Sequence, residues 1–201
     1  MNESKIEQSA EIHPSVTLGA GVQIWQFSQL RENSVIGDNC RIGRNVYLGP
    51  GVKLGDNCKI QNNALVYEPA ILGTGVFIGP GAILTNDSYP RAVNTDGSIK
   101  QSGDWTASGV QVNDGASIGA GSICVAPVSI GAWALVGAGS IVTKDVPAFG
   151  LVVGSPARQI GWVGEQGVPL FAEDDNIFIC PKSRERYELV GNVLVKIEAH
   201  T

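Results

Sequence analysis

Residues 12–30 read IHPSVTLGAGVQIWQFSQL, and in this stretch Ile12, Leu18, Ile24 and Leu30 are spaced six positions apart. A helix repeats its apolar positions every three or four residues and a strand every two, so a period of six fits neither element alone. The spacing continues without a gap through Ile36, Ile42, Leu48, Leu54, Ile60, Val66, Leu72, Ile78 and Leu84. The chain is therefore built on a unit of six residues.

Each unit offers a second inward position, two residues before the aliphatic one. That position is small or aliphatic throughout: Val16, Val22, Ser28, Ser34, Cys40, Val46, Val52, Cys58, Ala64, Ala70, Val76 and Ala82. Residues two apart in a strand face the same side, and the Gly, Asp and Asn that follow favour a turn. Because one such unit cannot bury its own face, hexads predict an all-β fold, a parallel β-helix with three hexads per coil and the outline of a triangular prism.

A second block of hexads runs through Val112, Ile118, Cys124, Ile130, Val136 and Val142. The 28 positions from Leu84 to Val112 are not a multiple of six, so residues 85–109 are expected to leave the prism as an external loop. A long polar loop in a rigid repeat is typical of a functional segment. The alternative is a tolerated surface insertion.

Composition and charge exclude several classes of partner. The net charge is −5 and no run of Lys and Arg stands out, which argues against nucleic acid and against a membrane surface. No apolar stretch has signal-peptide length or approaches a membrane span, so we expect a cytoplasmic protein. The four cysteines lie far apart and there are two histidines, so we expect no metal; a zinc site of the γ-class carbonic anhydrase type needs three imidazoles.

The hexads, the loop opening TNDSYPRA at 85–92 and the ending VGAGSIVTKDVPAFGLVVGSPARQIGW at 136–162 resemble a known family. It is the left-handed β-helix hexapeptide-repeat acyltransferases, and within them the bacterial N-acetyltransferases that act on nucleotide-linked 3-amino sugars of surface polysaccharides such as lipopolysaccharide. The resemblance implies acetyl-CoA as the donor and a homotrimer with active sites between neighbouring prisms. It assigns residues 1–163 to the acyltransferase domain; residues 164–201, richer in charge, are expected to form a C-terminal appendage of short strands.

The histidines bear on the chemistry. An alcohol needs a base to attack a thioester, whereas the free-base form of an amine is already nucleophilic. His13 is expected to be a structural residue of the first coil, and His200 is one residue from the end, so an amine acceptor is favoured. The resemblance implies direct attack, with the leaving sulfur receiving the proton and with the asparagine of the loop motif, Asn86, near the reacting amine as the catalytic residue.

Residues 18 apart lie one coil apart, which predicts that several polar side chains share one edge of the prism. The residues predicted to bind the nucleotide sugar are Gln29, Arg31, Asn62, Tyr67, Glu68, Tyr89 and Arg91. The two arginines suit anionic groups such as a diphosphate or a sugar carboxylate, although exposed arginines are also commonly just solvated. In the resembling family the stretch that contains Asn62 lies near the nucleotide-sugar site. The alternative role for Asn62 is structural, as part of a ladder of hydrogen-bonded asparagines in a turn.

Coenzyme A is predicted to lie along the later coils. Lys144 and Arg158 are the expected partners of its phosphates, Pro156 stiffens the exit from the last coil, and Gly119 and Gly137 would allow the pantetheine arm to approach the backbone. The two glycines are equally compatible with a role as corner residues.

Two other functions are open at this point. One is a CoA-dependent acyltransferase on another amine or on a hydroxyl acceptor, and the other is a non-catalytic β-helix scaffold. The choice between a dTDP-linked and a UDP-linked sugar is also open; Asp87 favours dTDP, because some relatives that act on UDP-uronates carry an apolar residue there.

Overall fold

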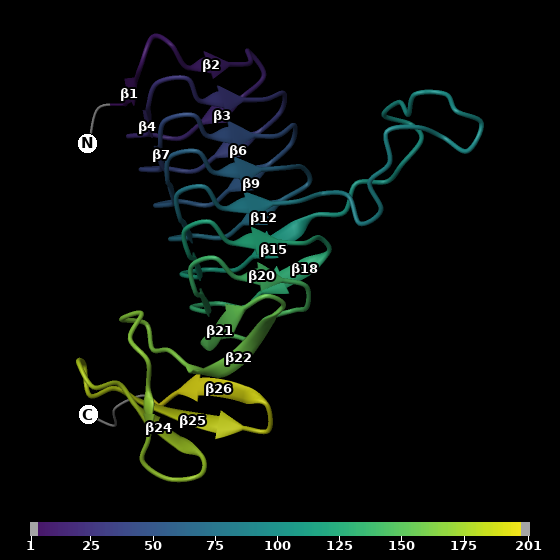
Figure 1. Ribbon diagram of the computed structural model, residues 1–201. Helices are drawn as coiled ribbons and strands as arrows, with labels where there is room; N and C mark the ends of the chain where they lie inside the picture. Colours follow the sequence, from purple (N-terminus) through teal and green to yellow (C-terminus); the bar gives the residue numbers. More distant parts are fainter. Residues whose placement is uncertain (1–3, 198–201) are drawn as a thin grey trace.

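The computed structural model describes residues 4–197, and this range contains strands but no helix. Short strands stack coil on coil into a three-sided parallel β-helix, as Figure 1 shows. The all-β parallel β-helix predicted from the hexads is therefore confirmed. No helix in the described range could cross a membrane.

Three sheets form the sides of the prism. Sheet A contains β1 (Lys5–Ile6), β4 (Gln23–Ile24), β7 (Arg41–Ile42), β10 (Lys59–Ile60), β13 (Phe77–Ile78), β16 (Ser117–Ile118), β19 (Leu135–Val136), β21 (Gly150–Gly154) and β22 (Ala157–Trp162). Sheet B contains β2 (Glu11–Ile12), β5 (Gln29–Leu30), β8 (Tyr47–Leu48), β11 (Leu65–Val66), β14 (Ile83–Leu84), β17 (Ile123–Cys124) and β20 (Ile141–Val142). Sheet C contains β3 (Thr17–Leu18), β6 (Val35–Ile36), β9 (Lys53–Leu54), β12 (Ile71–Leu72), β15 (Val110–Val112) and β18 (Val128–Ile130).

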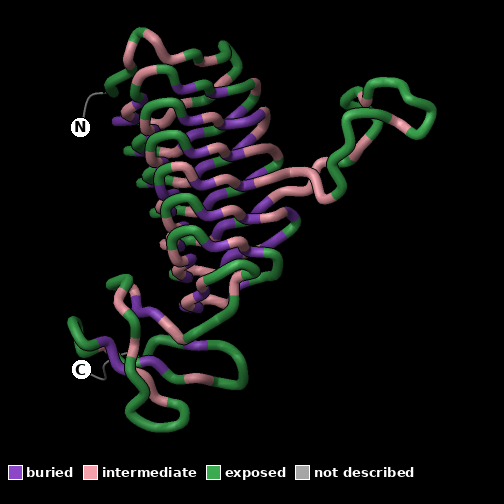
Figure 2. The backbone as a smooth tube through the Cα atoms, viewed as in Figure 1, coloured by how far each residue is buried: buried purple, intermediate pink, exposed green. Residues whose placement is uncertain are grey.

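The register explains the core. Leu30 pairs with Leu48 and Val66 pairs with Leu84, so equivalent hexad positions stack directly on one another. Leu48 and Val66 are fully buried, and the smaller hexad position is equally buried at Cys40. Figure 2 shows the resulting alternation of buried and more exposed backbone along each coil. Stacking of adjacent coils therefore supplies the burial that one hexad cannot achieve by itself.

The corners between strands repeat one hydrogen bond, which we call the corner ladder. A side-chain oxygen of one coil accepts the backbone N–H of the coil before it, as Asp38 Oδ1 does from Ala20 N at 2.8 Å and Asp56 Oδ1 from Asp38 N at 2.7 Å. The third corner residue has positive φ, for example 55° at Asn45, and asparagine tolerates this conformation. The Asp and Asn residues of the repeats are thus explained by the turns.

We name the edges of the prism by the sheets that they join. The B–C edge follows each strand of sheet B and consists of residues 13–16, 31–34, 49–52, 67–70, 125–127 and 143–146, together with the loop. The loop occupies residues 85–109, between β14 and β15, and projects from the prism in Figure 1. Its two ends are joined where Ser108 N donates to Asn86 O at 2.8 Å. The A–B edge follows each strand of sheet A.

The last part of the chain forms a separate small sheet. Its antiparallel strands are β23 (Phe171–Ala172), β24 (Ile177–Ile179), β25 (Arg186–Val190) and β26 (Val193–Lys196). Phe149, Cys180, Tyr187 and Leu194 form its core. Lys196 pairs with Glu165 at 2.7 Å and with Glu185 at 2.6 Å, which raises the lysine pKa.

Candidate active site

The B–C edge brings together four of the residues predicted from the sequence. Arg31 N donates to Leu48 O at 2.9 Å and Tyr67 N donates to Leu84 O at 3.2 Å, so the residues that directly follow the strands of sheet B form one column. That column is His13, Arg31, Gly49, Tyr67, Thr85 and Val125, and the next is Pro14, Glu32, Pro50, Glu68, Asn86, Ala126 and Lys144. With about 4.8 Å per coil, Arg31 lies roughly 14 Å along the edge from Asn86.

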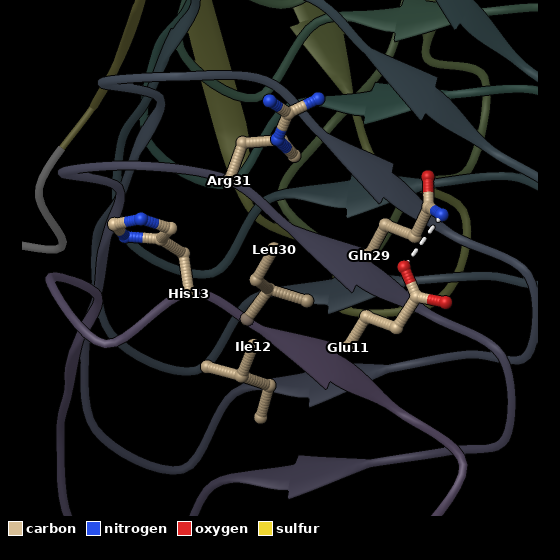
Figure 3. Close-up of a pocket in the computed structure, with 6 residues that line it drawn as sticks. All are labelled: Glu11, Ile12, His13, Gln29, Leu30 and Arg31. Atoms are coloured by element: carbon tan, nitrogen blue, oxygen red, sulfur yellow. Dashed lines mark hydrogen bonds between the residues drawn. The ribbon is translucent and has the colours of Figure 1, made fainter.

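A pocket of about 330 Å³ opens at the N-terminal end of this edge, between Glu11, His13, Gln29 and Arg31. In Figure 3, His13 and Arg31 lie on one side of it and Glu11 and Gln29 on the other, where Gln29 Nε2 donates to Glu11 Oε2 at 2.8 Å. The guanidinium of Arg31 and the imidazole of His13 therefore line the same side of this hollow.

Arg31 does not stand alone in this pocket. Its Nη2 and Nε donate to Glu32 at 2.9 and 3.1 Å, and this hydrogen bonding lowers the pKa of Glu32. The guanidinium is thus oriented by a neighbouring carboxylate that also offsets part of its charge. An incoming anion would compete with Glu32 for Arg31.

Two tyrosines lie between Arg31 and Asn86, Tyr67 on the edge and Tyr47 in the adjoining strand β8. The rings of Tyr47 and Tyr67 lie 5.1 Å apart at 47°. Burial and the charge of Glu68 raise the pKa of Tyr47, while Arg31 opposes the rise. Tyr47 was not predicted to be a site residue. The signal in the sequence was its position one coil after Gln29, which was predicted to bind the nucleotide sugar.

Asn86 lies half-buried at the root of the loop. The neck is held by Thr85 Oγ1, which accepts from Ala126 N at 3.0 Å, and by Ser88 Oγ, which donates to Ala126 O at 3.0 Å. A pocket of about 360 Å³ at this neck is lined by Tyr89 and by residues that the sequence reasoning missed, Lys100 and Trp105 among them.

The two other loop residues of interest project into solvent. Tyr89 is 85% exposed, and Arg91 is exposed with its Nη1 donating to Pro90 O at 2.8 Å. Tyr89 N donates to Asp87 Oδ1 at 2.7 Å, a local contact of the loop. The predicted roles of Tyr89 and Arg91 in substrate binding stay predictions.

The two basic residues predicted for coenzyme A, Lys144 and Arg158, lie near the C-terminal end of the edge. Lys144 lies on the B–C edge two coils after Asn86, and Lys144 and Arg158 line the same pocket of about 170 Å³. Pro156 lies in the turn between β21 and β22. The structure thus brings the lysine and the arginine together.

Gly119 and Gly137 lie elsewhere, on the A–B edge. A Cβ at Gly119 would lie 2.5 Å from Ala138 N, and one at Gly137 would lie 2.7 Å from Val153 Cγ1. Close packing of the next coil accounts for both glycines without a ligand, in line with the corner alternative.

Asn62 also lies on the A–B edge and not beside Asn86. Its Oδ1 accepts from Arg44 N at 2.8 Å, and Asn45 Nδ2 donates to Asn63 Oδ1 at 3.1 Å. The asparagine ladder considered as its alternative role is therefore present. A pocket of about 360 Å³ adjoins it, lined by Trp25 and Arg44 among others.

Within residues 4–197, no cluster of His, Cys, Asp and Glu side chains has an arrangement that could hold a metal ion. Of the two histidines, His13 lies four coils, or about 19 Å, from Thr85 along the edge. Its Nδ1 lies 2.8 Å from Ser15 Oγ. His200 lies outside the described residues.

The chain matches two families of repeats. Residues 33–68 and 51–86 match the bacterial transferase hexapeptide (six repeats), and residues 109–144 match the hexapeptide repeat of succinyl-transferase. The interruption between the matched segments coincides with the loop. The prism thus carries hexapeptide repeats similar to those of bacterial transferases.

Curated relatives include two kinds of acetyltransferase. The chain is 36% identical over 87 residues to dTDP-3-amino-3,6-dideoxy-alpha-D-galactopyranose 3-N-acetyltransferase of Aneurinibacillus thermoaerophilus, which is 43% of this chain and 44% of the relative. It is 40% identical over 83 residues to serine acetyltransferase 4 of Arabidopsis thaliana, 41% of this chain and 22% of the relative. The chain thus spans less than half the length of these relatives.

A solved structure extends the comparison over most of the fold. An N-acyltransferase from Bacillus cereus, solved as a mutant in complex with dTDP and coenzyme A, matches 81% of this chain and 84% of its own with a TM-score of 0.53 at 21% identity. That likeness shows the shared fold. The repeats and these relatives together confirm the resemblance to hexapeptide-repeat acyltransferases that the motifs indicated.

Proposed function

We propose that this protein is an N-acetyltransferase that moves an acetyl group from acetyl-CoA to the 3-amino group of a nucleotide-linked sugar. The observation that carries the proposal is the B–C edge, which has Arg31 near one end, Lys144 near the other and Asn86 between them. Two phosphate-bearing substrates that meet at one reacting carbon need this order of groups. We place the protein in the cytoplasm.

The dimensions of the edge suit an extended acceptor. With its amine at Asn86, a nucleotide sugar pointing towards the N-terminal coils would pass the Tyr47 and Tyr67 rings and bring its diphosphate towards Arg31, roughly 14 Å away. A guanidinium matches phosphate oxygens bidentately. Coenzyme A would approach from the opposite end, with Lys144 and Arg158 facing its phosphates.

The chemistry needs little from the protein beyond placement. The amine nitrogen attacks the thioester carbonyl carbon, the C–S bond breaks, and the proton lost by the nitrogen goes to the leaving sulfur. Holding amine and thioester in contact makes the reaction effectively unimolecular. Asn86, with a donor and an acceptor in one amide, is assigned to orient the amine.

A dTDP-linked acceptor is favoured over a UDP-linked one. The relative from Aneurinibacillus thermoaerophilus is named for a dTDP-3-amino sugar, and Asp87 follows Asn86 in the loop motif. The products would supply the synthesis of surface polysaccharide.

A hydroxyl acceptor is the second candidate, because the match to serine acetyltransferase 4 reaches 40% identity over 83 residues. Such an acceptor needs a base, and His13 is about 19 Å from the column position beside Asn86. We therefore rank the amine first.

The proposal includes a homotrimer with the site between prisms. The A–B edge, with Asn62, and the B–C edge, with Asn86, lie on different corners of one prism. In a cyclic trimer the A–B edge of one subunit could face the B–C edge of the next, which would complete a site that one prism leaves open.

The test is release of free thiol from acetyl-CoA with a panel of dTDP- and UDP-linked 3-amino sugars and with L-serine. We expect turnover with an amino sugar, and a loss of at least about 100-fold in Asn86→Ala, in the range for removing one group that stabilises a transition state. Asn176→Ala, in an exposed turn of the C-terminal sheet, is the matched control and should keep wild-type turnover. Turnover of serine alone would favour the second candidate, and absence of both turnover and CoA binding would favour a scaffold.

A further inference from the structure

One carboxylate on the B–C edge lacks the partner that its equivalents have. At the corners, Asp38 Oδ1 accepts from Ala20 N at 2.8 Å, Asn62 Oδ1 from Arg44 N at 2.8 Å and Asp114 Oδ1 from Thr74 N at 2.7 Å. In each case the oxygen lies over the glycine that precedes the donor: Gly19, Gly43 and Gly73. Each of these side-chain oxygens therefore already accepts a hydrogen bond that joins one coil to the next.

Glu68 occupies the equivalent place with no donor beneath it. Its Oε2 lies over Gly49 as the ladder oxygens lie over their glycines, but the next residue is Pro50, which has no N–H. Glu68 Oε2 is consequently the one buried side-chain oxygen or nitrogen within residues 4–197 that has no hydrogen-bond partner. An unpaired buried acceptor is costly, so this carboxylate gains by turning to any donor that reaches the edge.

The position of Glu68 selects the donor. The residue is half-buried, so part of it faces solvent at the edge, and it lies one coil, about 4.8 Å, from Asn86 in the same column. Its charge is felt at Tyr47, whose ring borders the same edge. A carboxylate that is not engaged, one coil from the expected reacting nitrogen, suits a cationic amine better than a neutral hydroxyl.

Resting on the proposed function, we propose that Glu68 binds the amino group of the acceptor, and that Pro50 keeps Glu68 available by denying it the corner ladder. An N–H of the ammonium form donates to the carboxylate, which draws this form into the site and discriminates against the sugar that carries a hydroxyl at the same carbon. The ammonium releases one proton to solvent before the reaction, so that the nitrogen attacks as the free amine. Asn86 then orients the nitrogen towards the thioester.

The experiment is calorimetric binding of a nucleotide-linked 3-amino sugar and of its 3-hydroxy counterpart, in the presence of CoA, to the full chain. Glu68→Gln keeps the shape and removes the charge. We expect its Kd for the amino sugar to rise about 10- to 100-fold, the range for losing a hydrogen bond to a charged group, with less than about a twofold change for the hydroxy sugar. Glu188→Gln, exposed on the C-terminal sheet, is the matched control and should change neither Kd.

Pro50→Ala provides the second variant, because it leaves Glu68 in place and restores the backbone N–H. We expect it to draw Oε2 into the corner and to raise the Kd for the amino sugar severalfold, with the hydroxy sugar unaffected. Equal effects on both sugars in Glu68→Gln, or no effect in either variant, would overturn the role of Glu68 while leaving the enzyme intact. A wild-type chain that binds neither sugar nor CoA would instead overturn the proposed function and this inference with it.

Discussion

Replacing Pro50 by alanine should stabilise the fold, although proline is usually the more stabilising residue in a loop. The alanine N–H would lie beneath Glu68 Oε2, where the other corners have their ladder hydrogen bond. A hydrogen bond to a charged group contributes about 1.5–3 kcal/mol, and loss of the proline's restriction of the unfolded chain costs about 0.4–1 kcal/mol. The net gain is about 1–2 kcal/mol.

Thermal unfolding followed by circular dichroism measures this gain. For a domain of this size, about 1 kcal/mol corresponds to a shift of roughly 2–4 °C, so Tm should rise by about 2–8 °C. The matched background is Glu68→Ala, in which Pro50→Ala has no oxygen to bond and should lower Tm slightly. Coupling between the two positions isolates the new hydrogen bond. A fall in Tm on the wild-type background, or the same shift on both backgrounds, would show that the ladder account of this corner is wrong.

Three further predictions concern the ends of the edge and the core. Lys144→Ala and Arg158→Ala should each raise the Kd for acetyl-CoA about 3- to 30-fold by calorimetry while leaving sugar binding unchanged, and equal weakening of both ligands would contradict the assignment. Glu32→Gln should tighten binding of the free nucleoside diphosphate severalfold, because it frees Arg31. For the same reason the affinity of the wild type should rise as pH falls through the lowered pKa of Glu32, where the carboxylate becomes protonated. An affinity that neither the substitution nor the pH change alters would show that Arg31 is not part of the site. Burial raises the pKa of the Cys124 thiol to about 12, so iodoacetamide at about pH 8 should leave this thiol unmodified in the folded protein and alkylate it in denaturant, as read by mass spectrometry of peptides.

The sequence determined the architecture of the prism because its signal is strictly periodic. Leu48 and Val66 recur at the hexad spacing and are buried in register, as the hexads require. The columns on the B–C edge followed from the same arithmetic, since 18 residues make one coil. This is why Arg31, Tyr67, Glu68 and Asn86 could be placed together before the structure was known.

Other features could not be read from spacing. The spacing puts Asn62 one corner away from Asn86, because 24 positions are one coil and one side of the prism. It does not say which edges contribute to one site, so Asn62 and Gly119 were grouped with residues that lie on a different edge. The pairing of Arg31 with Glu32 depends on side-chain rotamers, and the unpaired Glu68 Oε2 depends on Pro50, a residue 18 positions earlier. The first is a contact between neighbouring residues of one coil, and the second becomes visible only when one coil is stacked on the next.

A crystal structure of the protein with CoA and a dTDP-linked 3-amino sugar would test the central claim most directly. The account predicts that the sugar nitrogen lies within hydrogen-bond distance of Asn86 and Glu68 on the B–C edge, with the diphosphate towards Arg31 and the CoA phosphates towards Lys144 and Arg158. A nucleotide sugar bound away from the B–C edge, with its nitrogen remote from Asn86, would contradict it.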